Sequence, residues 1–160
     1  MISKTWEGTT TLNVKLTFEP QFVDRPRGMS VLWRGPLLFS LPIPSRSVKH
    51  EYERNGVERK FPYCDYEYFA TASWNYAFAG KDVAVEEHPL PDMPFAEDKP
   101  PVTLSLSMVR IPWAIHEKSI AIAAPQPTSL TPEGAAEQKT LIPFGSTMLR
   151  MTEMPIVKAD

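Results

Sequence analysis

The sequence has little of three features that would point directly to a function: cysteine, charge of one sign and long apolar runs. Cys64 is the single cysteine, so one chain can form neither an internal disulfide nor a thiolate cluster that holds a metal. Seventeen Lys and Arg residues against 19 Asp and Glu residues give a formal net charge of -2. Nucleic-acid binding needs a basic stripe that neutralises phosphates, and the sequence has none. We therefore expect no nucleic-acid partner, no metal and no other cofactor.

Apolar runs in the sequence are short. None approaches the roughly 20 residues that cross a bilayer, and the N-terminal residues MISKT lack the apolar core of a signal peptide. We therefore expect a soluble protein without a membrane partner. A cytoplasmic location is favoured, although the single cysteine leaves the redox compartment open.

Sequence signatures of catalysis are also missing. There is no nucleophile elbow, P-loop or dinucleotide fingerprint. His50, His88 and His116 have no partner at the spacing of metal ligands, so surface positions are favoured. Asp65 and Glu67 would share one face of a strand, about 7 Å apart at Cα. Because glycosidases usually bring their two carboxylates from separate elements, a solvated strand face is favoured over catalysis, and no catalytic residue is predicted.

Proline is abundant instead, with 17 spread over the 160 residues, and it breaks the chain into pieces that few long helices would survive. Apolar residues make up 42% of the chain, enough for the core of a single domain over residues 1–160. Polar and apolar residues alternate in residues 9–18 and 102–110, which is the period of a half-buried strand. We expect an all-β fold, a two-sheet antiparallel β-sandwich of jelly-roll type with roughly ten strands. The proline-rich residues 89–101 are expected to form a long surface loop.

Local signals divide the chain further. Residues 31–39 contain two short apolar runs around Arg34-Gly35-Pro36, which predicts one bent strand that serves both sheets. Asn55-Gly56 between two charged arms predicts an exposed hairpin with a type I′ turn. Thr131 followed by proline indicates a short helical turn, and residues 119–124 are expected to form a strand.

Three stretches resemble one known family. Residues 33–39 (WRGPLLF) follow Trp6-Glu7-Gly8 and the alternating residues 9–18, residues 74–78 (WNYAF) lie in the middle, and residues 141–152 (LIPFGSTMLRMT) lie near the end. In this order they resemble the C-terminal region of glycoside hydrolase family 127 and its relatives. These are the β-L-arabinofuranosidase-type enzymes, once catalogued as a domain of unknown function. The resemblance covers nearly all of the chain.

The resemblance implies a division of labour. In that family the catalytic glutamates and a zinc-holding cysteine cluster lie in an α/α toroid that precedes such segments, and none of those positions maps onto this chain. The chain is therefore expected to be a non-catalytic C-terminal accessory β-sandwich domain of a glycoside hydrolase, without hydrolysis of its own. Its expected partners are the toroid of the parent protein and a plant-type carbohydrate.

The alternative is a free-standing carbohydrate-binding, lectin-like module; an independent enzyme has the least support. Trp74, Tyr76 and Trp113 are the candidate carbohydrate-binding residues, because flat aromatic rings stack on sugars and polar residues surround these three. Aromatic residues in a sandwich are more often core residues, which bury large apolar areas. Exposure of Trp74 and Trp113 would distinguish the two possibilities.

Overall fold

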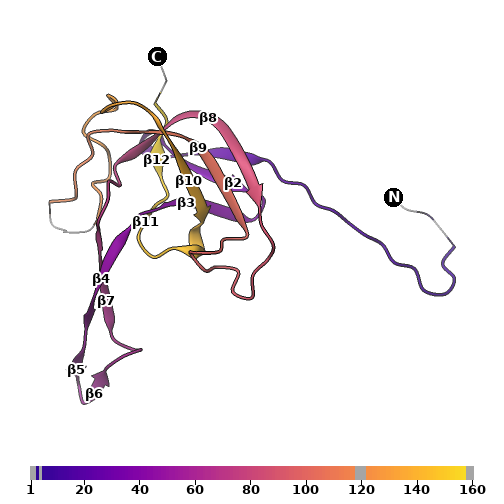
Figure 1. The fold of residues 1–160 in the computed structure, drawn as a ribbon, viewed down its shortest axis with the longest axis horizontal. Coiled ribbons are helices and arrows are strands. Elements are labelled where there is room, and N and C mark those ends of the chain that lie inside the picture. The colour runs from indigo at the N-terminus through magenta and orange to yellow at the C-terminus, as the bar shows by residue number, and fades with distance from the viewer. Residues whose placement is uncertain (1–2, 4, 118–121, 158–160) are drawn as a thin grey trace.

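The computed structural model describes residue 3 and residues 5–117 and 122–157. In this part of the chain nearly all regular structure is β-strand, arranged in three antiparallel sheets (Figure 1). This confirms the expected all-β fold class. The elements are β1 (Pro20–Arg25), β2 (Met29–Arg34), β3 (Leu37–Pro42), β4 (Ser45–His50), β5 (Tyr52–Arg54), β6 (Val57–Arg59), β7 (Asp65–Ala70), β8 (Tyr76–Glu87), β9 (Val102–Arg110), β10 (Glu137–Pro143), β11 (Arg150–Met151) and β12 (Met154–Pro155), with 3-10 turns η1 (Pro26–Gly28) and η2 (Phe144–Ser146).

The largest sheet curls so that its two ends come together. Its strand order is β1-β2-β3-β10-β9-β8, with β11 added to β3 and β12 to β2. Phe22 of β1 meets Phe78 of β8 edge to face, with ring centroids 5.0 Å apart. Met154 of β12 pairs with β2, and the nearby Ile156 forms a bridge with Phe78. The curled sheet thus places two layers face to face over one core, as a β-sandwich does.

The core lies between these two layers. Alternation along β9 predicts an inward face at every second residue, and Val102, Leu104, Leu106 and Met108 are all buried. Near the two ends of the strand, Thr103 and Val109 of the opposite face are buried as well. The side chains with less than 2% exposure include Leu32, Phe39, Phe78, Leu104, Leu106, Met108, Ile111, Leu141 and Met154. Residues 88–101 join β8 to β9 without a strand, as expected for a surface loop.

Residues 31–39 form a hairpin, so the prediction of one bent strand was wrong. Strand β2 ends at Arg34, β3 begins at Leu37, and the two pair antiparallel. Gly35 has φ of +57°, a backbone conformation that glycine adopts without steric cost. A two-residue hairpin turn with glycine first matches the twist of the flanking strands, which is why the chain reverses here instead of bending.

A long two-stranded arm, residues 45–70, projects from the curled sheet (Figure 1). Strands β4 and β7 form its base, and the β5–β6 hairpin forms its tip. Positive φ angles at Asn55 (55°) and Gly56 (74°) are those of the expected type I′ turn. The predicted hairpin and its exposed character are both confirmed, because every residue from 51 to 60 is exposed.

The N-terminal residues 9–18, called the leading segment below, form no strand, so the prediction of a half-buried strand was wrong. The segment runs away from the curled sheet as an extended chain (Figure 1). An isolated extended segment has no neighbouring edge with which its backbone can pair, although its side-chain pattern is that of a strand.

Two smaller expectations also need correction. Residues around Thr131 form no helical turn, and the chain enters β10 at Glu137. Of the strand expected at residues 119–124, residues 119–121 lie outside the described residues. Ala123 forms only an isolated bridge with Ile115.

Candidate functional site

The aromatic residues predicted to bind carbohydrate lie near one another, but two of the three are buried. Tyr76 is 4% exposed and Trp113 is 7% exposed. Trp113 lies beside Trp74, with ring centroids 6.0 Å apart, and its indole Nε1 donates a hydrogen bond to the carbonyl oxygen of Ala124 at 2.8 Å. Tyr76 and Trp113 are therefore core residues, the alternative that the sequence left open, and cannot form a sugar-binding surface with Trp74. The period of two along β8 places Tyr76 on the inward face with Phe78, and only Trp74 keeps part of its ring accessible.

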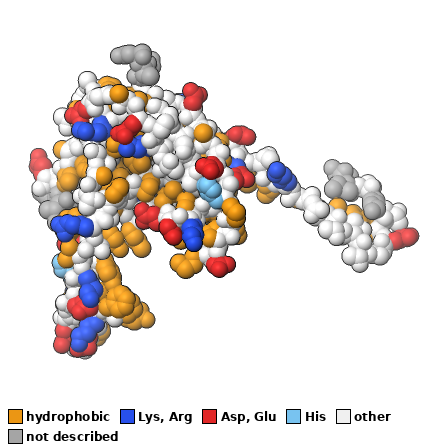
Figure 2. All heavy atoms as spheres, viewed as in Figure 1, with side chains coloured by type: hydrophobic (Ala, Val, Ile, Leu, Met, Phe, Trp, Pro, Cys, Tyr) orange, Lys and Arg blue, Asp and Glu red, His pale blue; other side chains and the backbone are white. Residues whose placement is uncertain are grey.

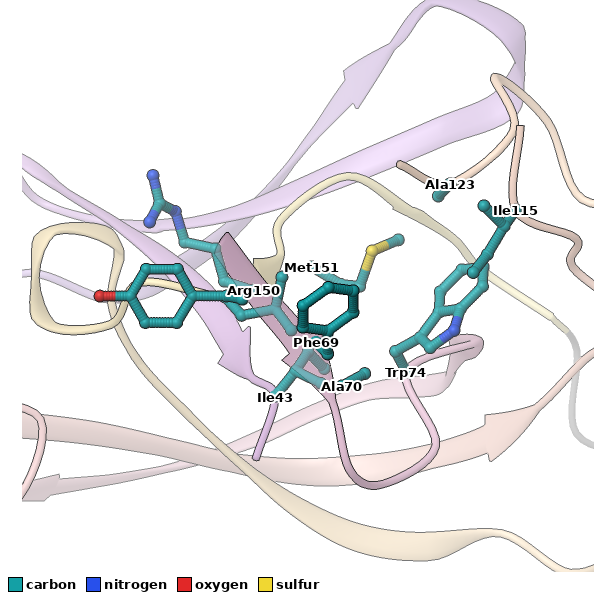
Figure 3. Close-up of a pocket in the computed structure, with 10 residues that line it drawn as sticks. Ile43, Phe69, Ala70, Trp74, Ile115, Ala123, Arg150 and Met151 are labelled. Atoms are coloured by element: carbon teal, nitrogen blue, oxygen red, sulfur yellow. The ribbon is translucent and has the colours of Figure 1, made fainter. Parts of the chain in front are cut away.

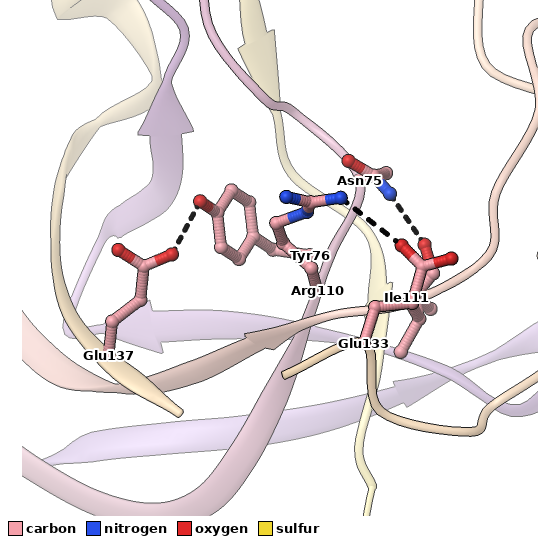
Figure 4. Close-up of polar contacts among 6 residues, drawn as sticks. All are labelled: Asn75, Tyr76, Arg110, Ile111, Glu133 and Glu137. Atoms are coloured by element: carbon pink, nitrogen blue, oxygen red, sulfur yellow. Dashed lines mark hydrogen bonds and ion pairs between the residues drawn. The ribbon is translucent and has the colours of Figure 1, made fainter. Parts of the chain in front are cut away.

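Polar groups around this aromatic cluster bind one another (Figure 4). The Asn75 amide, which had suggested a sugar-facing surface, donates to the carbonyl oxygen of Ile111 at 2.6 Å. Arg110 forms an ion pair with Glu133 at 3.4 Å. The Tyr76 hydroxyl donates to Oε1 of Glu137 at 2.7 Å. The first contact joins the residue before β8 to the residue after β9, the second joins β9 to the segment before β10, and the third joins β8 to β10. Their role is therefore structural.

The carboxylate of Glu137 has a shifted titration. Hydrogen bonds from the Tyr76 hydroxyl and from Lys139 lower the pKa of Glu137 below its ordinary value. Burial by itself lowers the pKa of the Lys139 ammonium group. Hydrogen bonds with Glu137 and Tyr76 outweigh this effect and raise that pKa overall. A carboxylate with a lowered folded-state pKa stabilises the fold above its unfolded pKa, and that contribution is lost as pH falls through the folded pKa.

We expect Tyr76→Phe to return the pKa of Glu137 toward its ordinary value, because the main hydrogen bond to the carboxylate is removed while the ring stays buried. The variant should be less stable than the wild type at pH 7, and the difference should narrow below about pH 4.5. Carboxyl titration by NMR and urea unfolding between pH 2 and 7 measure both effects. The exposed Tyr63→Phe is the control. A stability difference that stays constant over this range would contradict the assignment.

A cavity of about 230 Å³ lies where the base of the arm meets the curled sheet (Figure 3). Its lining is mostly apolar, with Phe69 from the arm, Trp74 and Met151 among the contributors. Arg150 also lines it, but its guanidinium stacks 3.6 Å from the centre of the Phe144 ring and donates to the carbonyl oxygen of Thr147 at 2.6 Å. The cavity is smaller than the roughly 300–1,000 Å³ of typical ligand pockets. Among the predicted residues, only Trp74 reaches it.

The acidic pair on β7 faces other side chains of the arm. Asp65 accepts a hydrogen bond from the Tyr52 hydroxyl at 2.9 Å, which raises the pKa of that hydroxyl. Glu67 lies 3.1 Å from Nε2 of His50, measured to its Oε2. Each carboxylate thus has its own partner on the surface of the arm, as expected for a solvated strand face.

No group of three His, Cys, Asp or Glu side chains in residues 3, 5–117 and 122–157 is placed so that it could hold a metal ion. The part of the chain that the structure describes contains no helix with the length and hydropathy needed to cross a membrane.

Exposed apolar side chains gather on the arm, which is the surface that sequence reasoning missed. Figure 2 shows hydrophobic side chains along one side of the arm. Phe61 is 69% exposed and Tyr63 is 80% exposed. Tyr52, Val57 and Tyr66 on the arm are exposed as well. The aromatic richness of this stretch was visible in the sequence, but alternation alone does not tell a buried aromatic strand from one that projects into solvent.

Comparisons with known proteins found no relative: no protein-family model matches the chain, and neither the curated proteins nor the solved structures gave a significant match. Fold and surface therefore define the class. The described chain is an all-β domain with a projecting arm that carries exposed apolar side chains.

Proposed function

We propose that the chain is a non-catalytic β-sandwich domain that packs against the catalytic α/α toroid of a family 127-like glycoside hydrolase. The observation that carries the proposal is the apolar side of the arm. Soluble monomers rarely expose large contiguous apolar patches, and such patches mark protein interaction surfaces. The resemblance of residues 33–39, 74–78 and 141–152 to the C-terminal region of that family supplies the identity of the partner.

The arm has the composition of a docking surface. The charges beside the Phe61 ring are paired: Lys49, which lies 5.8 Å from the centre of that ring, binds Glu51 at 2.9 Å, and the adjacent Lys60 binds Glu58 at 2.8 Å. Its aromatic rings remain accessible. Interfaces are enriched in aromatic residues and depleted of unpaired charge at their centre. Burial of the Phe61 ring and its neighbours against the toroid would therefore cost little desolvation of charge.

The contribution of this domain to hydrolysis would be indirect. Within the described residues, the acidic pair of the arm is bound to neighbours and the cavity is apolar, so neither supplies the two opposed carboxylates that glycosidases use. The domain would stabilise the toroid and limit the approach of carbohydrate to it. The catalytic groups would belong to the partner.

A complementation experiment tests this function. We expect the parent polypeptide, expressed without this domain, to hydrolyse arabinofuranosides at least tenfold more slowly or to melt at a lower temperature. Addition of the separately purified domain should restore the activity, whereas the domain alone should give no turnover. Turnover by the purified domain, or full activity and stability of the toroid without it, would contradict the proposal.

A carbohydrate-binding module is the second candidate, and one observation favours it: Trp74 is partly exposed and lines the apolar cavity. On this hypothesis, titration with arabinofuranosyl oligosaccharides should shift the Trp74 indole resonance. Trp74→Ala should weaken binding at least tenfold, while Tyr63→Ala, an exposed aromatic remote from the cavity, should leave it unchanged. If no resonance shifts at millimolar oligosaccharide, the module hypothesis is rejected and the accessory role stands.

A further inference from the structure

The leading segment carries the side-chain pattern of a strand without the burial of one. Leu12, Val14, Leu16 and Phe18 alternate with polar residues and are 59%, 80%, 71% and 41% exposed. No strand of the described residues pairs with this segment. In a sheet strand with one buried face, apolar and polar residues alternate, since every second side chain points to the buried side. The pattern therefore fits a surface that the described chain does not provide.

The C-terminal end of the leading segment is bound to the β2–β3 turn of the curled sheet. Nε of Arg34 donates to the carbonyl oxygen of Phe18 at 3.0 Å, and the Phe18 ring lies against Gly35 in the β2–β3 turn. By the period of two, Leu16 and Phe18 belong to the same face as Phe22 of β1, which packs on Phe78 in the core. By this period the apolar face of the leading segment continues the inner face of β1. The backbone of the segment runs from β1 beyond the edge of the domain (Figure 1).

We propose that the leading segment becomes a β-strand by adding to an open sheet edge in a second folded unit, whose apolar layer then covers Leu12, Val14, Leu16 and Phe18. The inference rests on the proposed function in one respect: the receiving unit is assigned to the parent hydrolase. It adds a structural requirement, because that unit must contain β-sheet. An α/α toroid cannot provide it, since helices satisfy their own backbone groups and offer no ladder to an extended segment.

Backbone hydrogen bonding is the reason for a sheet edge. If the apolar side chains were buried on a helical surface, the N–H and C=O groups of the extended segment would be buried with them. An unpaired buried backbone group costs free energy comparable to a lost hydrogen bond. An open strand edge pairs these groups along the whole segment, and the threonines and Val14 have high strand propensity.

A second copy of this chain is a poor receiver, because both ends of the curled sheet carry charge. Exposed Lys81, Asp82 and Glu86 lie along β8, and exposed Asp24 and Arg25 lie on β1. Charged edge strands are a common device against strand addition. We therefore assign the receiving edge to a different unit, not to self-association.

Hydrogen–deuterium exchange tests the inference on unmodified protein. In the native hydrolase polypeptide we expect the amides of residues 11–18 to exchange at least a hundredfold more slowly than in the isolated chain, where they should exchange within seconds. Equally fast exchange in both would overturn the inference and leave the accessory function intact. Slow, concentration-dependent exchange in the isolated chain would also overturn it, since a second copy would then be the receiver.

Failure of the proposed function gives a different result. Slow exchange of these amides within a longer polypeptide that lacks glycosidase activity would support strand addition but reject the hydrolase assignment. The two outcomes are therefore separable in one preparation that is assayed for both exchange and turnover.

A pair of matched variants locates the covered face. Leu16→Asp places a charge on the apolar side, whereas Lys15→Asp changes the charge on the polar side. In the native polypeptide we expect Leu16→Asp to abolish most of the amide protection of residues 11–18 and to lower the melting temperature, with little change for Lys15→Asp. Neither should change the melting temperature of the isolated chain, where both side chains are exposed. Equal effects of the two variants in the native polypeptide would overturn the assignment of faces.

Discussion

Replacement of Phe78 by alanine should lower the free energy of unfolding of the isolated domain by about 3–5 kcal/mol. Phe78 is fully buried, and its ring packs against the ring of Phe22. Its backbone forms a β-bridge with Ile156 near the C-terminus. A cavity at this position would separate the two ends of the curled sheet. Single domains are stable by only about 5–15 kcal/mol, so the variant should lose a large part of its stability.

Urea unfolding of the wild type, Phe78→Ala and Phe61→Ala measures this effect. Phe61 is the matched control because it is the same residue type but 69% exposed on the arm, so its substitution should change stability by about 0.5 kcal/mol or less. A loss below about 1 kcal/mol for Phe78→Ala would contradict the placement of this ring at the closure of the sheet.

Removal of the outer arm should weaken association of this domain with the proposed catalytic toroid at least tenfold while leaving the domain folded. Residues 49–66 can be replaced by Asn-Gly between Val48 and Glu67, which are paired across β4 and β7. The base of the arm is closed independently, because the amide of Thr71 donates to the carbonyl oxygen of Pro44 at 2.8 Å. The large effect is expected because a few buried aromatic residues dominate the energy of most interfaces.

The control for this excision is Leu90→Ser, which changes another exposed apolar residue, in the loop between β8 and β9. Binding to the proposed toroid, expressed separately, is measured by calorimetry, and the fold of each variant by its melting temperature. Unchanged affinity after excision of the arm, with the melting temperature preserved, would reject the arm as the docking surface.

Local chemistry explains which parts of the fold were predictable. Strand β9 was predicted with its observed bounds, because alternation from Val102 to Met108 identifies both the strand and its main buried face. The β5–β6 hairpin was predictable because Asn55-Gly56 adopts positive φ angles with little strain. The reversal at Gly35 was missed, since glycine followed by proline permits either a bend or a hairpin turn, and pairing with a partner strand decides between them.

The candidate site was less predictable for reasons of packing. Tyr76 and Trp113 were candidates for exposure because polar residues surround them. The Asn75 side chain instead donates to the backbone carbonyl of Ile111, and both rings are buried. Conversely, the alternation of the leading segment predicts a half-buried strand, yet Leu12, Val14 and Leu16 are 59%, 80% and 71% exposed. The period of two shows that one face of a segment is apolar, but it does not show which polypeptide buries that face.

The size of the native polypeptide tests the central proposal most directly. An antibody raised against this chain, applied to an extract of the cells that produce it, should detect a band several times larger than 18.1 kDa that copurifies with arabinofuranosidase activity. Such a band is expected of an accessory domain joined to a catalytic toroid. A single band at 18.1 kDa, without associated hydrolase activity, would contradict the accessory role and leave the carbohydrate-binding module as the remaining candidate.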